Sequence, residues 1–490
     1  MPAGYTALDF YYLLPELVLT VAALVLLIAD AVVPRVRQSV LAWVAVAGLL
    51  ATIGCTLAVA GAHTTAARGL VAVDGFAAFF NVIFLLAALL TVLISVRYLD
   101  VEDARPGTYY FLVLSATLGM MFMASGIDLI TIFIGLETMA ISFYILTGFL
   151  KPNRRSNEAA VKYFLLGAFS LGLLLYGMSL LYGLSGSTSL RTIATSLAGH
   201  ERALPLVLAV ILVVAGVGFK IAAVPFHMWA PDVYEGAPTP ITAFLSVGSK
   251  AASFAMLLRI FLEGLPSMSA DWRMLFYALS VVTMTVGNVA ALTQGNIKRM
   301  LAYSSIAHAG YLLIGVVAGT PRGVSAMLIY LFIYAFMQTG AFAVVVLLRR
   351  RDVIGDELKD LSGLYFRSPG AAVAMLIFML SLGGIPPTAG FMGKFWLFGS
   401  AIEAGYVWLA LIGVLNSAVS LYYYVRVIVF MWVKGEAAGS PVVVGPTMAA
   451  ALAVALVAII VLGIYPRPLF ELAEASARTL GVVGITAAVR

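Results

Sequence analysis

Four ionisable side chains lie deep inside apolar stretches of this sequence. Glu137 lies in GLETMAISFYILTGF, Lys220 in LVVAGVGFKIAAVPFH and Lys250 in SVGSKAASF, while Lys394 ends the stretch SLGGIPPTAGFMGK. A charged side chain at the centre of a membrane helix costs roughly 2.5–3.5 kcal/mol on insertion scales, so such a group needs a functional or structural reason. His308, in LAYSSIAHAGY, adds an imidazole, a group whose ordinary pKa of about 6.5 suits proton transfer near neutral pH.

These residue types favour a row of protonatable sites over one catalytic pocket. Burial raises the pKa of a carboxyl group and lowers that of an ammonium group, whereas contact between the two favours both charged forms. Making and breaking such a contact can therefore load and release a proton. The alternative for Glu137 and the lysines is a set of static buried ion pairs, and for His308 a hydrogen-bonded core histidine.

Lys162 and His227 each leave two interpretations open, whereas Arg259 and Glu263 favour a structural one. Lys162, in NEAAVKYFLLGAFSLG, lies about one turn into an apolar run, so its ammonium either snorkels to the surface or takes part in proton transfer. His227 follows Pro225 in PFHMW and either lines a cavity or caps a helix break. Arg259 and Glu263, spaced i,i+4 near a helix end, predict a surface ion pair.

The elements that position these residues must lie in lipid. Of the 490 residues, 62% are hydrophobic and only 11% are charged, too few to cover a soluble globule of this size. The net charge of +6 gathers in short loops between apolar runs, which argues against a nucleic-acid partner. The single cysteine, Cys55, excludes a disulfide framework, a cysteine-ligated cluster and a zinc site built from this chain alone.

Apolar runs long enough to cross a hydrocarbon core recur along almost the whole chain. The first run reaches full spanning length and lacks the features of a cleaved signal peptide, so we expect a retained helix. The sequence predicts an all-α polytopic membrane protein with about fourteen transmembrane helices, near 10–32, 39–61, 73–97, 108–124, 127–150, 157–184, 204–226, 238–262, 273–294, 297–318, 323–348, 369–398, 404–433 and 443–465.

Lysines and arginines in the short loops predict the orientation in the membrane. Successive loops lie on alternate sides of the membrane, and one of the two alternating sets carries most of these residues. The loops of this set are expected on the cytoplasmic side. Both termini are then expected on the outer face of the cell inner (plasma) membrane. The residues that decide the orientation are Arg35, Arg37, Lys151, Arg154, Arg155, Lys298, Arg299, Arg349, Arg350 and Arg351.

Two of the expected helices are interrupted by proline and glycine. Pro225 breaks the seventh and the run Gly383 to Pro387 breaks the twelfth, each a few residues from a buried lysine. Interrupted helices at corresponding places indicate inverted repeats and mark cavities. We therefore expect a three-helix segment, two inverted five-helix repeats in which Glu137 corresponds to His308 and Lys220 to Lys394, and a last helix with a tail; the residue ranges are 1–107, 108–263, 264–434 and 435–490.

The chain resembles the antiporter-like membrane subunits of respiratory complex I, and among them most the subunit N group. The resemblance covers nearly the whole chain. It rests on the motifs quoted above together with FKIAAVPFHMWAPDVYEGAPTPITAF (219–244) and NIKRMLAYSSIAHAGY (296–311). The subunit M group has a glutamate at the position that matches Lys394, which disfavours that assignment.

The resemblance implies a role for each buried residue. It implies a charge pair between Glu137 and Lys220, a central Lys250, a connecting His308 and an outward exit near Lys394. It also implies that NADH, FMN, iron–sulfur clusters and quinone bind in partner subunits, both membrane and peripheral. No cofactor or metal is then expected in this chain.

Two rival functions remain open from the sequence. A subunit of a multisubunit cation/proton antiporter or of a membrane-bound hydrogenase shares this pattern of lysines. A passive scaffold of the same fold is the third possibility, although the retained buried charges disfavour it.

Overall fold

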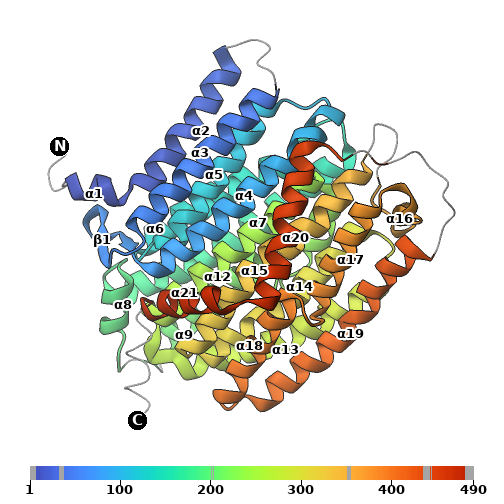
Figure 1. Cartoon of the computed structure of the whole chain (residues 1–490). Coiled ribbons are helices and arrows are strands. Elements are labelled where there is room, and N and C mark those ends of the chain that lie inside the picture. The colour runs from blue at the N-terminus through green and yellow to red at the C-terminus, as the bar shows by residue number, and fades with distance from the viewer. Residues whose placement is uncertain are drawn as a thin grey trace.

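The computed structural model of the chain describes residues 7–32, 38–199, 201, 203–349, 355–433, 442 and 444–480. These residues form a bundle of helices with a single small hairpin of strands (Figure 1). Twelve described helical segments are long and apolar enough to cross a membrane. The predicted class, an all-α polytopic membrane protein, is confirmed. Of the loop residues used to predict orientation, Arg35, Arg37, Arg350 and Arg351 lie outside the described residues.

The long helices occur throughout the described chain. They are α2 (Leu14–Val32), α3 (Gln38–Val59), α4 (Gly75–Val101), α5 (Pro106–Ser125), α6 (Leu129–Thr147), α7 (Arg154–Ser185), α9 (Leu204–Lys220), α13 (Ser269–Leu292), α14 (Ile297–Ala318), α15 (Pro321–Leu348), α17 (Pro369–Gly383), α18 (Ala389–Glu403), α19 (Val407–Trp432), α20 (Pro446–Ile464) and α21 (Arg467–Arg478).

Shorter elements connect or interrupt them. They are α1 (Ala7–Tyr12), β1 (Thr64–Ala66), η1 (Ala67–Gly69), β2 (Val71–Val73), α8 (Leu190–Ser196), α10 (Trp229–Gly236), α11 (Thr239–Phe244), η2 (Leu245–Ser249), α12 (Lys250–Leu258), η3 (Arg259–Gly264), η4 (Pro266–Met268), η5 (Leu358–Leu361) and α16 (Leu364–Arg367). The elements α11, η2, α12 and η3 follow one another directly and form one segment, Thr239–Gly264, in which η2 and η3 are π-helical.

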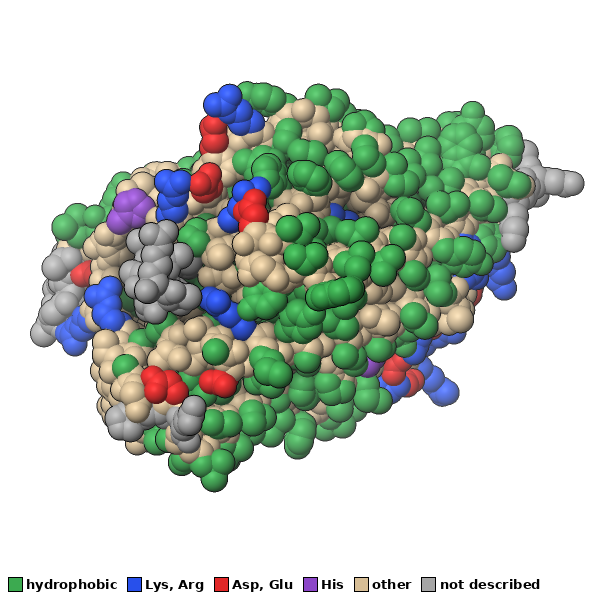
Figure 2. All heavy atoms as spheres, turned by 90° about the horizontal axis from the view of Figure 1, so that it is seen from below, with side chains coloured by type: hydrophobic (Ala, Val, Ile, Leu, Met, Phe, Trp, Pro, Cys, Tyr) green, Lys and Arg blue, Asp and Glu red, His purple; other side chains and the backbone are tan. Residues whose placement is uncertain are grey.

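Burial separates a central group of helices from a peripheral one. The most apolar 18-residue window is 100% buried in Thr239–Gly264 and 94% buried in both α14 and α15, but only 28% buried in α2 and α20. Figure 1 shows α12, α14 and α15 in the middle of the bundle. The peripheral helices expose large apolar side chains, as a surface in contact with lipid requires, and Figure 2 shows how widely these cover one face.

The two expected helix breaks are present. α9 ends at Lys220, six residues before the predicted end of its span, and the chain turns through Pro225 before α10 begins. α17 ends at Gly383, and α18 begins at Ala389 after a turn in which Gly384 has a φ of +81°. The breaks divide two of the expected spans. The pieces α9 and α17 are apolar but too short to count among the twelve spanning segments. The count of about fourteen spans therefore stays a prediction.

The C-terminal region contains a helix that the sequence did not predict. We expected a tail after the last span, but α21 follows α20 and lies across the long helices, packed against α15 and α4 (Figure 1). Leu469 and Ala473 are buried, whereas Arg467 and Glu471 on the opposite face are largely exposed and form an ion pair. The helix is therefore amphipathic and covers the bundle rather than crossing the membrane.

The prediction that Arg259 and Glu263 form a surface pair is wrong about the location of the pair. The two side chains do pair at 2.8 Å, but Arg259 is only 1% exposed. Its guanidinium also binds both oxygens of the Asp74 carboxylate, at 2.8 and 2.9 Å, and donates to the carbonyl oxygen of Ala124. Asp74 follows the β1–β2 hairpin and caps α4 by accepting from the amide of Ala77. This cluster ties the start of η3 to the start of α4.

The buried arginine gives the first testable prediction. Replacement Arg259→Leu leaves the Asp74 carboxylate without its cation, and breaking a buried pair from one side costs about 3–5 kcal/mol. We expect a clear fall in the thermal unfolding midpoint of the purified protein in detergent. Arg467→Leu removes an exposed pair and serves as the control, with little change expected. An unchanged midpoint for Arg259→Leu would contradict the structural role of the cluster.

The turn at Gly384 gives a second prediction about stability. A Cβ at this position would lie 2.9 Å from Cδ of Lys394, and its positive φ is strained for any residue with a Cβ. Gly384→Ala is expected to destabilise the protein by about 1–3 kcal/mol, the usual cost of a non-glycine residue in such a conformation. A Cβ added at Gly370, in the preceding helix α17, meets no atom within 4 Å, so Gly370→Ala should leave the unfolding midpoint nearly unchanged. Equal midpoints for both variants would refute the assigned strain.

Candidate functional site

Glu137 and Lys220 lie near one another but do not touch. Glu137 is half-buried in the middle of α6, and Lys220 is the last residue of α9. Their charges interact electrostatically, although the two groups form no direct ion pair within 4.0 Å. Tyr144 lies beside both residues, with its ring centroid 5.7 Å from the Lys220 ammonium. The charge pair that the resemblance implied is not formed by direct contact here, so it stays a prediction.

The polar atoms of this group are unusually short of protein partners. Oε1 of Glu137, Nζ of Lys220 and the Tyr144 hydroxyl are all buried without a hydrogen-bond partner among the described residues. Burying such a group without a partner is costly, and most buried polar groups in proteins are paired. An arrangement that tolerates this cost is typical of a functional site.

Lys250 occupies the most deeply buried segment of the bundle. The π-helical turn η2 directly precedes it, and π-helical turns are frequent at functional sites. Its ammonium donates to both the backbone carbonyl and the hydroxyl of Ser305, with 2.5 Å between Nζ and the Ser305 Oγ. The Tyr234 hydroxyl lies 3.4 Å from the same Ser305 Oγ. The Ser305 hydroxyl therefore contacts the lysine, and the Tyr234 hydroxyl lies next to that of Ser305.

His308 lies in the centre of the second half of the chain. Its Nδ1 lies 2.6 Å from the Tyr330 hydroxyl and its Nε2 lies 3.0 Å from the Tyr424 hydroxyl. Both ring nitrogens thus have a hydroxyl partner that can donate or accept, which allows either tautomer of the imidazole. The His308 ring also interacts electrostatically with both Lys250 and Lys394. The imidazole therefore lies within electrostatic reach of both lysines.

Lys394 is held by the broken end of α17. Its ammonium donates to the carbonyl oxygens of Leu382 and Gly383, at 2.9 and 3.1 Å, and to the Ser417 hydroxyl at 2.8 Å. The last carbonyls of a helix lack intrahelical partners and carry partial negative charge, so a cation there is stabilised. The helix break thereby gives a buried ammonium its ligands.

Lys162 belongs to a more exposed network of charges. With a side chain 42% exposed, it pairs with Glu158 at 2.7 Å and with Asp232 at 2.8 Å. The Asp232 carboxylate also binds Arg299, which in turn contacts Glu235. The network joins α7, α10 and α14 at one end of the bundle, so both alternatives for Lys162 remain possible.

His227 lies in the turn between α9 and α10. Its backbone carbonyl accepts from the amide of Ala230 near the start of α10, while the ring Nδ1 is buried without a hydrogen-bond partner. The residue thus accompanies the helix break, as expected, but the structure does not place it beside Lys220 or Lys250 through any described contact.

The sequence missed the residues that connect the ionisable groups. Ser305, Tyr330 and Tyr424 provide the hydroxyls described above, and Asp232 and Arg299 form the charged network. A tyrosine or serine in an apolar run resembles an ordinary core residue, and only its contacts reveal its role. Asp232 and Arg299 were visible as charges near helix ends, where a topological function is the simpler interpretation.

Comparison with known proteins places the chain in a family. Residues 125–420 match the family described as "NADH:quinone oxidoreductase/Mrp antiporter, TM". NADH-quinone oxidoreductase subunit N of Trichlorobacter lovleyi is 48% identical over 480 residues, which cover 97% of this chain and 98% of that protein.

Solved structures agree in fold. A chain of respiratory complex I from Thermus thermophilus, solved with bound aureothin, superposes with a TM-score of 0.80 at 34% identity and covers 94% of this chain and 99% of that chain. A chain of the archaeal membrane-bound sulfane sulfur reductase superposes with a TM-score of 0.86 at 25% identity, with 98% and 100% covered. The chain belongs to the NADH:quinone oxidoreductase/Mrp antiporter family of transmembrane proteins.

Proposed function

We propose that this chain is a proton-translocating membrane subunit of an NAD(P)H:quinone oxidoreductase. The observation that carries the proposal is the group of buried Lys220, Lys250, His308 and Lys394 in the interior of a chain 48% identical to a subunit N. Relatives that resemble the chain over nearly their full length are named for this enzyme, which favours it over an antiporter or hydrogenase subunit. A scaffold without proton transfer has no need for buried ammonium groups that cost free energy.

The proposed mechanism uses the contacts of these residues. A change of charge at Glu137 alters the electrostatic environment of Lys220 and so controls proton transfer toward the centre. Protons enter near Lys162 and Lys220, pass from Lys250 to His308 and leave near Lys394. The hydroxyls of Tyr330 and Tyr424 can each hand on one proton while accepting another, so the imidazole can relay protons in either direction.

The partners and the setting follow from the same proposal. Other membrane and peripheral subunits bind NADH, FMN, the iron–sulfur clusters and quinone, and this chain carries no redox centre. It lies in the plasma membrane, with both termini on the outer face. The side chains of Arg154, Arg155, Lys298 and Arg349, from three loops predicted to share the cytoplasmic side, line one pocket at the same end of the bundle, which supports this orientation.

The internal repeat is also proposed. The two breaks, after α9 and after α17, each lie beside a buried lysine, which supports two inverted five-helix units over 108–263 and 264–434. They follow a three-helix segment, 1–107, and precede the last span and the amphipathic helix in 435–490.

Lys220, whose ammonium has no hydrogen-bond partner among the described residues, gives a direct test of this function. Lys220→Ala is expected to lower proton pumping and coupled quinone reduction severalfold in membranes, because it removes the ammonium that responds to Glu137. Assembly of the complex, followed by its subunit content, should be unchanged. Lys151→Ala alters an exposed loop lysine and serves as the control.

The outcomes separate the alternatives. Loss of pumping in an assembled complex supports a place for Lys220 in proton transfer. Full retention of both activities would show that Lys220 is structural and would contradict the proposed mechanism.

A further inference from the structure

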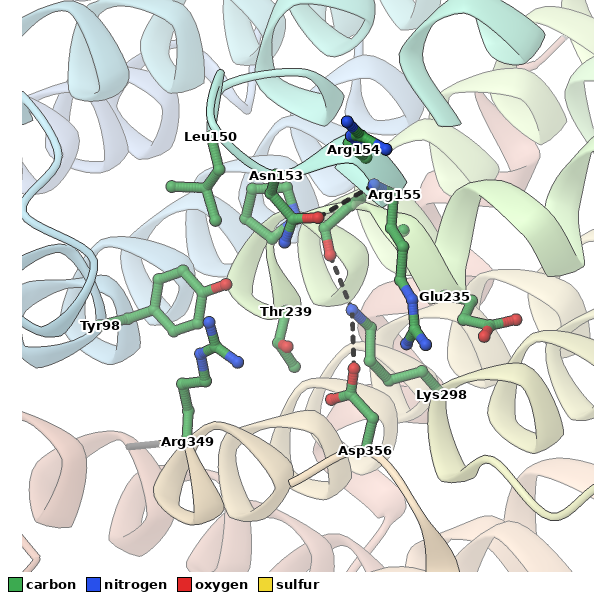
Figure 3. A pocket seen from close by; sticks show the side chains of 13 residues that line it. Tyr98, Leu150, Asn153, Arg154, Arg155, Glu235, Thr239, Lys298, Arg349 and Asp356 are labelled. Atoms are coloured by element: carbon green, nitrogen blue, oxygen red, sulfur yellow. Dashed lines mark hydrogen bonds and ion pairs between the residues drawn. The ribbon is translucent and has the colours of Figure 1, made fainter. Parts of the chain in front are cut away.

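A polar pocket opens at the end of the bundle that carries most of the loop cations. It has a volume of about 180 Å³, and helix ends from both halves of the chain surround it, including those of α4, α7, α10, α11, α14 and α15. Figure 3 shows Lys298 and Asp356 next to each other and joined by a dashed line, with Arg155 and Glu235 on one side of the pocket and Tyr98 and Arg349 on the other. This volume leaves room for several water molecules.

Asp356 is fixed in this pocket by the backbone. Its carbonyl accepts from the amide of Ile297 at 2.7 Å, and the amide of Leu358 donates to the carbonyl of Gly295 at 2.9 Å. These bonds pin the loop to the start of α14. The Asp356 residue is only 8% exposed, and its carboxylate lies 3.9 Å from the Lys298 ammonium.

The environment of Asp356 favours proton binding. Burial raises the pKa of its carboxyl group above the usual value, against the opposing effect of the Lys298 ammonium. The charged and titratable groups that face it from the surrounding elements are Lys298, Arg349, Arg155, Glu235 and Tyr98. A carboxyl group with a raised pKa holds a proton at a higher pH than an exposed aspartate does, and releases it as the pH rises through that value.

Lys298 links the pocket to the interior. Its ammonium, 3% exposed, donates to the carbonyl of Ala237 at 2.7 Å, at the C-terminal end of α10. Lys298 and Ser305 are seven residues apart on α14, which places them on one face with a rise of about 10 Å between them.

Tyr234 is next to the pocket in the chain and contacts Ser305 with its hydroxyl group. Tyr234 precedes the pocket residue Glu235 in α10, and its hydroxyl lies 3.4 Å from the Ser305 Oγ. Ser305 is the residue to which the Lys250 ammonium donates. Tyr234 and Ser305 therefore form a chain of hydroxyl groups that leads from the residue next to the pocket to the central lysine and includes neither Glu137 nor Lys220.

We propose that Asp356 takes up protons from the aqueous phase at this pocket and that Tyr234 and Ser305 pass them to Lys250. The inference rests on the proposed proton translocation and adds a second uptake route to it. Lys298 acts as a positioning residue, because its ammonium stabilises the Asp356 carboxylate between proton loads.

The transfer moves protons only. The carboxylate accepts a proton from a hydronium ion, leaving water, and returns to its charged form when the proton moves on through water in the pocket. The Tyr234 hydroxyl then releases its own proton toward Ser305 as it accepts the incoming one, and Ser305 does the same toward the neutral amine of Lys250. The amine becomes an ammonium, and no electron is transferred.

The test uses the assembled complex in proteoliposomes and measures protons pumped per NADH oxidised across a range of pH. Asp356→Asn is expected to lower this ratio and to remove the part of its pH dependence that belongs to the carboxyl group, while Asp356→Glu restores both in part. Tyr234→Phe removes only a hydroxyl and should lower the ratio in the same way. The control is Glu357→Gln, an exposed neighbour outside the pocket.

The results distinguish this inference from the proposed function. If Asp356→Asn and Tyr234→Phe both keep the normal ratio and pH profile while Lys220→Ala loses pumping, the uptake route is wrong and the proposed function stands. If all three variants pump normally, the proposed function itself fails. If Asp356→Asn does not assemble, a normal ratio and pH profile in Tyr234→Phe overturns the route and a lowered ratio supports it.

Discussion

A lysine ammonium in the interior of a membrane protein must find its acceptors within the protein, and this constraint governs the arrangement of the bundle. Lys394 is coordinated by two carbonyls that are free only because α17 ends at Gly383. Lys250 depends on the single residue Ser305, and Lys220 has no hydrogen-bond partner among the described residues. The three buried ammonium groups thus range from one without a described hydrogen bond to one with three acceptors, and backbone breaks and hydroxyls supply those acceptors.

The helix α14 organises the second half of this arrangement. It is almost entirely buried, and it carries Lys298 at its start, Ser305 beside Lys250, and His308 in contact with two tyrosines. A buried helix holds polar side chains at regular distances along its axis without exposing them to lipid. The central position of α14 therefore brings ionisable groups from both halves of the chain within electrostatic reach of one another.

The sequence predicted the type of fold and the buried ionisable residues because both depend on local patterns. The apolar run 297–318 matched α14, and Lys220, Lys250, His308 and Lys394 are all buried as expected. The burial of Arg259 could not be predicted, because its partner Asp74 is 185 residues away in the chain. The helix α21 was missed because charged residues such as Arg467 and Glu471 make its sequence look like a polar tail. Only its packing against the bundle shows that it is a helix with a buried face.

Other features arise only from tertiary packing. The sequence gives no measure of the separation between Glu137 and Lys220, which the resemblance implied would form a pair and which the structure holds beyond direct contact. Lys298, at the start of α14, looks like a marker of membrane orientation, and only the fold brings its ammonium to 3.9 Å from the Asp356 carboxylate.

Proton transfer through this protein is proposed to depend on the buried polar groups around Lys250. Lys250 joins the groups on the pocket side to His308, so both proposed uptake routes converge on it. The most direct measurement is the number of protons pumped per NADH oxidised by the assembled complex carrying Lys250→Ala in sealed proteoliposomes. We expect a lowered ratio in a complex with normal subunit content, whereas an unchanged ratio would show that Lys250 takes no part in proton transfer.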